Sequence, residues 1–533
     1  MALALRGWLA GVVFLTTLSA HALLIEPGDA ERFLMQASFG PTEADVARVK
    51  ELHYEGWITE QFQRPASHNL PLLLELKTRT DLVKEGKLNN AHRKYIWWRN
   101  AVTGGDQLRQ RLAYAWSQIF VVSDEANSLS GNPEALAHYY DTLVDQGLGN
   151  YRTLLGAVTH HPAMGVYLTY LRNEKADPEG KRRPDENYAR EIMQLFTIGL
   201  YELNPDGTRQ LVKGQPVPTY TNEDIQELAR VFTGMGFPPK DGKVGFKNAP
   251  QQWFTPLVHY PEFHDNGPKN ILGRKTLPAD QPAGKDVEDT LDILFHHPNT
   301  PPFVCRLLIQ RLTTSNPSPG YLRRVSEVFV NNGRGVRGDL QAVVRAILMD
   351  AEARLPAATY DKGMQREPYL RLVSLVRAFR GTAKDGTFTV SNLAQFLGQE
   401  PGSARSVFNF YLPSYSPPGP IADAGLVAPE FEITNAVTAI SLPNFLRDFI
   451  YRGKIGRAEG EVVLDFSREI QLARDPDALI QHLNLLLAGG RLRDSTRQII
   501  RGAIGEIPDT KPEERAKLAV YLTSISPESA ILP

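Results

Sequence analysis

The segment that decides the fold reads Arg183-Pro184-Asp185-Glu186-Asn187-Tyr188-Ala189-Arg190-Glu191-Ile192-Met193-Gln194-Leu195-Phe196-Thr197-Ile198-Gly199. Its ends carry helix signals: Pro184 has the fixed φ that suits a helix entry, Asp185 can cap the first free amides, and Gly199 suits a helix stop. Between them, apolar side chains recur at helical spacing, at Tyr188, Ile192, Leu195 and Phe196. The segment therefore predicts one helix with a buried stripe.

Polar side chains flank that stripe in two pairs. Glu186 and Arg190 are four residues apart, as are Asn187 and Glu191, so each pair lies on one helix face. An arginine lowers the pKa of a neighbouring carboxylate, whereas burial raises it. Two carboxylates with different pKa values give one site both an acid and a base. We therefore take Glu186, Arg190 and Glu191 as catalytic candidates and Asn187 as a substrate-binding candidate. A buried salt-bridge network that locks the helix in place is the alternative.

A second polar group, His264, Asp265 and Lys269, lies in an irregular region farther along the chain. A histidine beside a carboxylate can shuttle protons near neutral pH or bind a metal ion, and a lysine can bind an anion. We take His264 and Asp265 as catalytic candidates and Lys269 as a substrate-binding candidate. The alternative is that these side chains only fix the loop. The sequence identifies neither a metal nor a cofactor.

The composition is that of a folded protein with a large core. The chain has 533 residues, of which 42% are hydrophobic and 22% charged, with a formal net charge of −1. No global basic field draws it to nucleic acid, and the short basic clusters at 181–183 and 491–501 read as solvated faces. The only cysteine, Cys305, lies in an apolar helical context, which favours a buried, inert thiol over a nucleophile.

The first 22 residues differ from the rest. Arg6 is followed by an apolar run and then by Ala20-His21-Ala22, a cleavage pattern. Residues 1–22 are therefore predicted to be a secretory signal peptide, and the mature protein is predicted to be exported. The apolar run is shorter than the roughly 20 residues of a membrane span, although an uncleaved anchor stays an alternative. No second run of spanning length follows.

The periodicity of the remaining chain predicts an all-α fold with a small β-hairpin and long irregular loops. Four helices are clear at 286–297, 301–313, 320–331 and 338–349. The hairpin is expected at 200–212, an irregular region at 235–284 and a proline- and aromatic-rich loop at 399–433. We divide the mature chain into a main helical domain, 23–455, and a C-terminal helical unit, 456–533.

Well-known catalytic motifs are absent from the sequence. The sequence contains no Gly-x-x-x-x-Gly-Lys-Ser/Thr loop, no Gly-x-Ser-x-Gly elbow and no His-Glu-x-x-His pair. Nucleotide cradling by a P-loop, the common serine hydrolases and the zincins therefore lose most of their support.

The segment 183–199 and the His264-Asp265 pair belong to a longer set of strings that resembles one bacterial family. Its other members are Gly149 to Leu155, His161-Pro162-Ala163-Met164-Gly165, the helices around His297-Pro298 and Arg311, Ser406 to Tyr411, Pro429-Glu430-Phe431 and Ser526-Pro527-Glu528. Over nearly the whole mature chain, the sequence resembles the domain of unknown function 1800 family.

The resemblance implies an exported protein but little chemistry, since no activity is established for that family. It also implies a partner or shared pathway at the cell surface, an exported sulfatase-like protein of the domain of unknown function 1501 family. This chain departs from some members in one place, because Ser117 and Gln118 follow Trp116 where those members carry histidine. Any metal site that relies on histidines in that helix is therefore in doubt.

Two functions stay open at this stage. The first is an exported, hydrolytic enzyme of the cell envelope or extracellular space, in which segment 183–199 and the His264–Lys269 loop meet around water beneath the 399–433 loop. Its substrate is expected to be an envelope or extracellular polymer. The second is a non-catalytic exported scaffold or binding protein that acts with the surface partner, in which the same polar residues only hold the fold.

Overall fold

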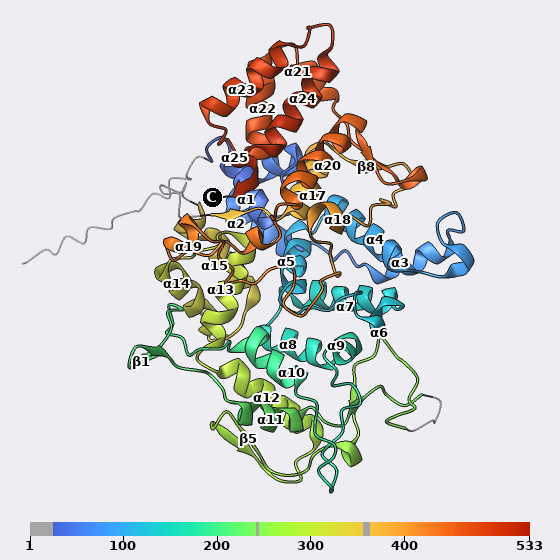
Figure 1. Ribbon diagram of the computed structural model, residues 1–533, viewed down its shortest axis with the longest axis vertical. Coiled ribbons are helices and arrows are strands. Elements are labelled where there is room, and N and C mark those ends of the chain that lie inside the picture. Colours follow the sequence, from blue (N-terminus) through green and yellow to red (C-terminus); the bar gives the residue numbers. More distant parts are fainter. Residues whose placement is uncertain (1–24, 241–244, 355–362, 533) are drawn as a thin grey trace, which may run out of the picture.

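The computed structural model describes residues 25–240, 245–354 and 363–532. The predicted signal peptide, 1–22, lies outside these ranges. Within them the chain is mainly helical, with only small antiparallel sheets of two or three strands, so the predicted fold class is confirmed (Figure 1).

The α-helices of the first half of the chain are α1 Asp29–Ala37, α2 Glu43–Gln63, α3 Leu70–Glu75, α4 Asn90–Thr103, α5 Gln107–Ser117, α6 Asn127–Ser130, α7 Pro133–Gln146, α8 Tyr151–His160, α9 Pro162–Tyr167, α10 Asn187–Glu191 and α11 Asn222–Val231. Those of the second half are α12 Ala283–His296, α13 Thr300–Leu312, α14 Pro319–Val330, α15 Leu340–Met349, α16 Ala351–Arg354, α17 Pro368–Ala378, α18 Ala394–Leu397, α19 Pro420–Asp423, α20 Thr438–Arg452, α21 Ser467–Leu472, α22 Pro476–Ala488, α23 Asp494–Gly505, α24 Pro512–Ile525 and α25 Pro527–Ala530. Short 3₁₀ turns are η1 Leu76–Thr78, η2 Lys84–Gly86, η4 Pro261–Phe263, η5 Pro429–Glu432 and η6 Ala458–Gly460.

The strands pair in antiparallel fashion. The two-stranded pairs are β1 Leu211–Val212 with β2 Gln215–Pro216, β3 Met235–Gly236 with β4 Val258–His259, β5 Lys269–Ile271 with β6 Lys275–Leu277, and β7 Met364–Gln365 with β11 Ile531–Leu532. The three-stranded sheet has the order β8 Thr382–Ala383, β10 Val462–Val463, β9 Lys454–Ile455. These strands tie loops together, and the helices form the core.

The segment 183–199 folds as a helix in two parts. Asp185 Oδ1 accepts a hydrogen bond from the Asn187 amide before α10 begins. After Glu191 the chain continues as one turn of π-helix, η3 Ile192–Thr197, and ends at Gly199 with φ +71°. A Cβ at Gly199 would lie 2.7 Å from the Phe303 ring, so glycine fits both the conformation and the space. A π-turn carries an extra residue, which turns the side chains after it.

That extra residue divides the predicted stripe. Tyr188, Ile192 and Phe196 are fully buried, as expected. Leu195 and Gln194 are only half-buried, and they line a cavity that is described below. The decisive helix therefore contributes both to the core and to a cavity wall.

The expected hairpin is longer and more irregular than predicted. Bridges join Tyr201 to Pro218 and Leu203 to Arg209, and β1–β2 forms the exposed tip at the lower left of Figure 1. In its turn, the Gly207 amide donates to the Asn204 carbonyl over 2.8 Å. The hairpin covers part of the same cavity.

The 399–433 segment is irregular, as expected, and it is held at both ends. At its start the Arg93 guanidinium donates to the Pro401 carbonyl, and the Asp124 amide donates to the Gly402 carbonyl. Near its end, the backbone of Val427 exchanges two hydrogen bonds with the Asn316 side chain. Between these anchors the segment crosses the middle of the molecule (Figure 1).

The C-terminal helices α21–α24 pack together at the top of Figure 1 and contact α17 and α20. The boundary that we expect between 455 and 456 falls between β9 and β10, which pair in one sheet. Buried residues of this unit belong to the same hydrophobic cluster as those of α1 and α4.

Two further observations bear on the sequence-based expectations. Cys305 is buried, and burial raises the pKa of its thiol far above the usual range, as an inert core thiol requires. No helix among the described residues is both long and apolar enough to cross a membrane.

Candidate functional site

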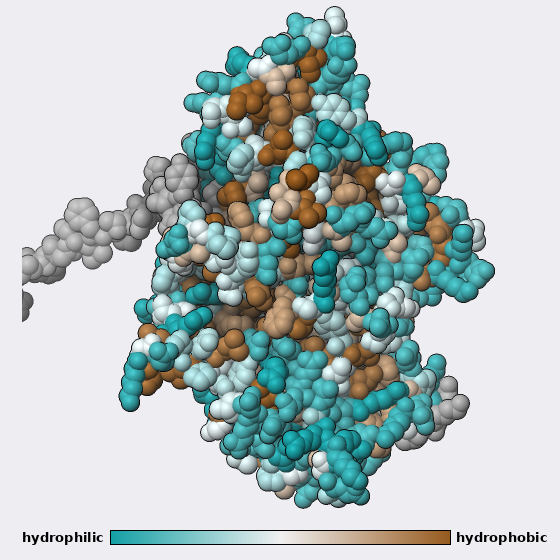
Figure 2. Space-filling model, viewed as in Figure 1, coloured by the Kyte–Doolittle hydropathy of each residue, from teal (hydrophilic) through white to brown (hydrophobic). Residues whose placement is uncertain are grey.

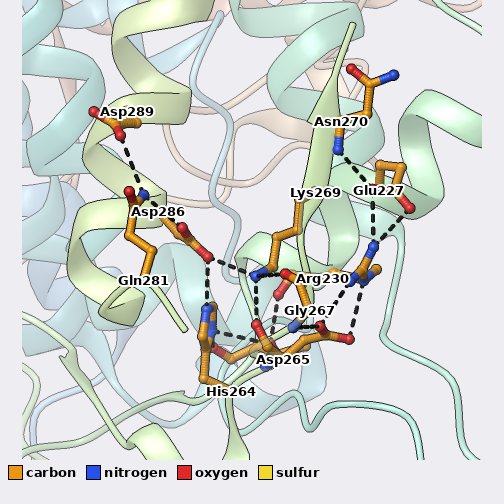
Figure 3. Close-up of polar contacts among 11 residues, drawn as sticks. Glu227, Arg230, His264, Asp265, Gly267, Lys269, Asn270, Gln281, Asp286 and Asp289 are labelled. Atoms are coloured by element: carbon orange, nitrogen blue, oxygen red, sulfur yellow. Dashed lines mark hydrogen bonds and ion pairs between the residues drawn. The ribbon is translucent and has the colours of Figure 1, made fainter. Parts of the chain in front are cut away.

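The polar group around His264 forms a closed network, which we call the His264 cluster: His264, Asp265, Lys269, Gln281 and Asp286 (Figure 3). One Asp286 oxygen accepts hydrogen bonds from His264 Nε2 over 3.0 Å and from Lys269 Nζ over 2.7 Å. The other accepts from Gln281 over 2.7 Å. Although burial alone would raise it, His264 and Lys269 hold the pKa of Asp286 below its usual range.

The remaining polar atoms of this cluster are also paired. Lys269 Nζ donates to the carbonyls of Asp265 and Gly267, and His264 Nδ1 lies 2.9 Å from the Thr233 carbonyl oxygen. The Asp265 carboxylate accepts two hydrogen bonds from the Arg230 guanidinium. Since His264, Lys269 and Asp286 are almost completely buried, the cluster matches the structural alternative, in which these side chains fix the loop.

The other polar group lies on α10 and at Glu186 just before it, and it is half-buried. Glu186 and Arg190 form an ion pair of 3.4 Å with both side chains about 40% exposed, and Asn187 is partly exposed beside them. Glu191 is buried, and its Oε2 has no hydrogen-bond partner. Burial raises the pKa of Glu191 to about 6, while Arg190 opposes the shift.

The structure does not bring the two groups into contact. Within the described residues, no hydrogen bond or ion pair joins Glu186, Arg190 or Glu191 to the His264 cluster. Over the same residues, no group of three or more histidine, cysteine or carboxylate side chains is placed to hold a metal ion. The candidates therefore occupy two separate environments.

A cavity of about 380 Å³ opens between α13, η3, the hairpin and the 399–433 segment, and we call it the central pocket. Figure 2 shows apolar residues around the recessed middle of this face. Its walls are mostly apolar and its polar lining groups are amides, arginines, a tyrosine and a serine. The lining residues are Gln118, Ile119, Gln194, Leu195, Gly199, Leu200, Tyr201, Leu203, Gly207, Arg209, Phe303, Arg306, Leu307, Gln310, Arg311, Val407, Phe408, Leu412, Pro413, Ser414 and Val427.

Gln118, Gln310 and Arg311 form the polar floor of this pocket. Each is largely buried, and the side-chain oxygens of both glutamines have no hydrogen-bond partner. Arg311 Nε is also unpartnered, and its guanidinium lies 4.4 Å from the centre of the Tyr411 ring. A ligand or water in the pocket can satisfy these atoms, so the floor has hydrogen-bonding capacity for a bound molecule.

Below the floor lies a buried network, the Glu430 cluster: Arg111, Tyr114, Gln118, Arg311, Glu367, Gln399, Tyr411 and Glu430. Glu367 Oε2 accepts three hydrogen bonds, from the Tyr114 hydroxyl and from the amides of Gln118 and Gln399. This is the bonding pattern of a carboxylate. Its other oxygen, Glu367 Oε1, has no partner. Through Gln118, the network is connected directly to the pocket.

Glu430 differs from Glu367. It is fully buried, and no donor meets its oxygens with good hydrogen-bond geometry. Burial raises the pKa of Glu430 to about 8; its own backbone amide, Arg311 and the Ser315 hydroxyl oppose the shift, and Glu367 adds to it. Glu430 is therefore protonated at neutral pH. The cluster contains two carboxyl groups in contrasting environments, the arrangement that supplies an acid and a base to one site.

Two buried arginines accompany these carboxyl groups. The Arg111 guanidinium donates to the Arg311 carbonyl, yet its Nε and one terminal nitrogen have no partner. Burial lowers the pKa of Arg111, and Glu367 opposes that shift. Neither Arg111 nor Arg311 makes a hydrogen bond to a carboxylate among the described residues.

Sequence reasoning did not select the Glu430 cluster, although several of its members stand in strings that carry the family resemblance. Arg311, Tyr411 and Glu430 all do so, and Gln118 is the point at which the chain departs from some members. The missing information was spatial, because α5, α13 and the 399–433 segment are far apart in sequence. Reading those strings as one site would have found it.

A comparison with protein families supports the resemblance. The family model described as "Protein of unknown function (DUF1800)" matches residues 32–531. The chain therefore belongs to that family, as its sequence strings predict. No curated protein and no solved structure matches the chain.

Proposed function

From membership of the DUF1800 family and from the Glu430 cluster, we propose that this chain is an exported protein that binds a small apolar-bodied molecule in the central pocket and hydrolyses it. One observation carries the proposal: a protonated carboxyl, Glu430, and a carboxylate with a free oxygen, Glu367, lie under the floor of a mostly apolar pocket. Pockets of a few hundred cubic ångströms with few polar groups are the usual ligand sites of proteins.

The chemistry assigns one role to each carboxyl group. Glu367 takes a proton from water as the water attacks the scissile bond, and Glu430 gives its proton to the leaving group. Transfer of a proton from Glu367 to Glu430 then restores the starting state. Gln118 lines the pocket, and its amide nitrogen donates to Glu367 Oε2 over 2.8 Å, so it connects Glu367 to the pocket. Gln118 is therefore a positioning residue.

Hydrolysis of a panel of chromogenic carboxylic, phosphate, sulfate and glycosidic esters by purified residues 23–533 tests this role. We expect turnover of at least one class, and a fall of about 100-fold or more in Glu430→Gln and in Glu367→Gln. Glu469→Gln is the matched control, because Glu469 is equally buried but lies in the C-terminal unit. Equal turnover in Glu430→Gln and in the unsubstituted protein would exclude Glu430 as the acid.

A non-catalytic binding protein is the second candidate function. The apolar walls of the pocket favour it as much as they favour the hydrolase. The two candidates differ in one result. A binding protein retains its ligand unchanged, whereas the hydrolase converts it, and only the hydrolase depends on Glu430 for turnover.

Export and partnership remain predictions that rest on the sequence. Cell fractionation and N-terminal sequencing of the mature protein test the first, with a new terminus at Leu23 expected. Co-purification with an exported sulfatase-like protein of the domain of unknown function 1501 family tests the second.

A further inference from the structure

We propose that the ligand of the central pocket is an amphipathic anion, whose oxyanion head group binds Arg306 and Arg311 and whose apolar body lies against Phe303, Phe408 and Leu412. This inference rests on the proposed ligand-binding role of the pocket and names the class of molecule that it takes.

The charge of the pocket lining has one sign. Arg209, Arg306 and Arg311 line the pocket, and no aspartate or glutamate of the described part of the chain lines it. A guanidinium in a partly buried wall costs solvation energy unless an anion compensates it. The lining therefore favours a negatively charged ligand.

The three guanidiniums of the pocket lining are also available to bind an anion. None of them forms an ion pair within residues 25–240, 245–354 and 363–532. Arg306 donates one hydrogen bond, to the Gly207 carbonyl over 3.1 Å. Arg209 and Arg311 instead lie over the rings of Tyr201 and Tyr411, at 4.6 and 4.4 Å from their centres. Most of their donors therefore remain available to an oxyanion, which guanidiniums bind through paired hydrogen bonds.

The groups under the floor do not cancel this charge. Arg111 and Arg311 face two carboxyl groups there, Glu367 and Glu430. Glu430 carries its proton at neutral pH, so two guanidiniums oppose a single negative charge. A bound anion would balance the remaining positive charge.

The walls fit an apolar body. Leu200, Phe408 and Leu412 all line the pocket, and each remains more than one third exposed. Large apolar side chains in such an exposed group indicate a binding surface. Contact with an alkyl or aryl group would remove them from water at a gain of about 25 cal/mol per Å². A hydrophilic anion such as free phosphate would leave this surface uncovered.

Arg306 lines a second cavity as well as the central pocket, and this position indicates where the head group binds. A smaller cavity of about 340 Å³ shares Arg306 and Val427 with the central pocket and is otherwise lined by Ser315, Asn316, Pro317, Ser318, Gly425 and Leu426. Arg306 thus stands between the mostly apolar central pocket and a cavity whose lining is richer in hydroxyl and amide groups. An amphipathic molecule is matched to that position, with its head group at Arg306.

Two fluorescent probes of similar size test the inference: 1-anilinonaphthalene-8-sulfonate, which is an anion, and N-phenyl-1-naphthylamine, which is neutral. We expect the sulfonate to bind with one site per chain. Arg306→Gln and Arg311→Gln should each weaken its binding by about tenfold or more and leave the neutral probe within about twofold. Dodecanoate and dodecyl sulfate should displace the sulfonate, whereas dodecanol and inorganic phosphate should not.

Control variants separate charge from folding. Arg306→Lys should restore part of the sulfonate binding, because it keeps the positive charge. Phe408→Ala should weaken both probes, because both need the apolar wall. Arg323→Gln, at an exposed residue of α14 that pairs with Glu327, should change neither.

The outcomes distinguish this inference from the proposed function. Equal binding of both probes, unaffected by Arg306→Gln and Arg311→Gln, would overturn the anionic ligand and leave a neutral-ligand pocket in place. Failure of both probes to bind would overturn the pocket as a ligand site as well. Sulfonate binding without turnover of any ester would retain this inference and remove the hydrolase.

Discussion

Two buried polar clusters of this protein differ in how their atoms are paired. In the His264 cluster every donor of Lys269 and both oxygens of Asp286 have partners. In the Glu430 cluster the carboxyl oxygens of Glu430, one oxygen of Glu367 and two nitrogens of Arg111 have none. Complete pairing stabilises a fold, whereas unpaired groups beside a pocket retain capacity for a ligand. The second cluster is therefore the candidate site.

The largest expected effect is on stability, and it tests whether the His264 cluster is structural. Asp286→Ala leaves the buried ammonium of Lys269 and the ring of His264 without their acceptor, so we expect a loss of about 3 kcal/mol or more in the free energy of unfolding. Adding Lys269→Met should recover part of it, because the uncompensated charge is then gone. Denaturant unfolding measures both. A loss below about 1 kcal/mol would show that the network does not hold the loop.

The second effect sharpens the assignment of Glu430. Because its pKa in the folded protein is about 8, against 4.5 unperturbed, the folded protein holds this proton over a range where the unfolded chain has lost it. The contribution of Glu430 to stability is therefore fully present below about pH 4.5 and is lost as the pH rises towards 8.

Glu430→Gln should remove this dependence and raise the stability above pH 8 by a few kcal/mol relative to the unsubstituted protein. Thermal unfolding between pH 4.5 and pH 8 measures it, with the exposed Glu327→Gln as control. Parallel pH profiles for Glu430→Gln and the unsubstituted protein would contradict a protonated Glu430.

A smaller effect of the same kind is expected at Glu191. Its pKa is raised to about 6 by burial, so its contribution is present below about pH 4.5 and is lost as the pH rises through about 6. Glu191→Gln should reduce the change in the free energy of unfolding over this narrower pH range by about 1 kcal/mol, since the group is only partly desolvated. The same unfolding series records it, and an unchanged slope would argue for an ordinary surface carboxylate.

The smallest effect is expected at the exposed pair on α10. Arg190→Gln removes an ion pair with Glu186 in which both side chains are about 40% exposed. Such pairs contribute about 0.5 kcal/mol, so stability should hardly change and probe binding in the central pocket should not change at all. A marked loss of turnover would instead support the predicted catalytic role of Glu186, Arg190 and Glu191.

Much of the fold could be predicted from the sequence because its helices are strongly periodic. The run α12–α15 lies within three residues of its predicted positions. The π-turn at Ile192–Thr197 could not be predicted, because one inserted residue leaves the apolar spacing nearly intact. Its consequence, that Gln194 and Leu195 face a cavity, followed only from the structure.

The candidate site was harder to predict for a physical reason. Gln118, Arg311, Glu367 and Glu430 lie on four separate segments, and each is unremarkable in its local sequence. The sequence drew attention instead to Glu186 and His264, where polar residues crowd within one stretch. Polar residues that are close together in sequence can form all their hydrogen bonds with one another. Their spacing alone therefore does not show whether any of them is left unpaired for a ligand.

The most direct test of the central claim compares Arg311→Gln with His264→Gln in one titration with 1-anilinonaphthalene-8-sulfonate, under conditions where both variants are folded. If the central pocket is the functional site and the His264 cluster is structural, Arg311→Gln weakens binding by about tenfold and His264→Gln leaves it unchanged. Loss of binding in His264→Gln, with Arg311→Gln unaffected, would contradict the account.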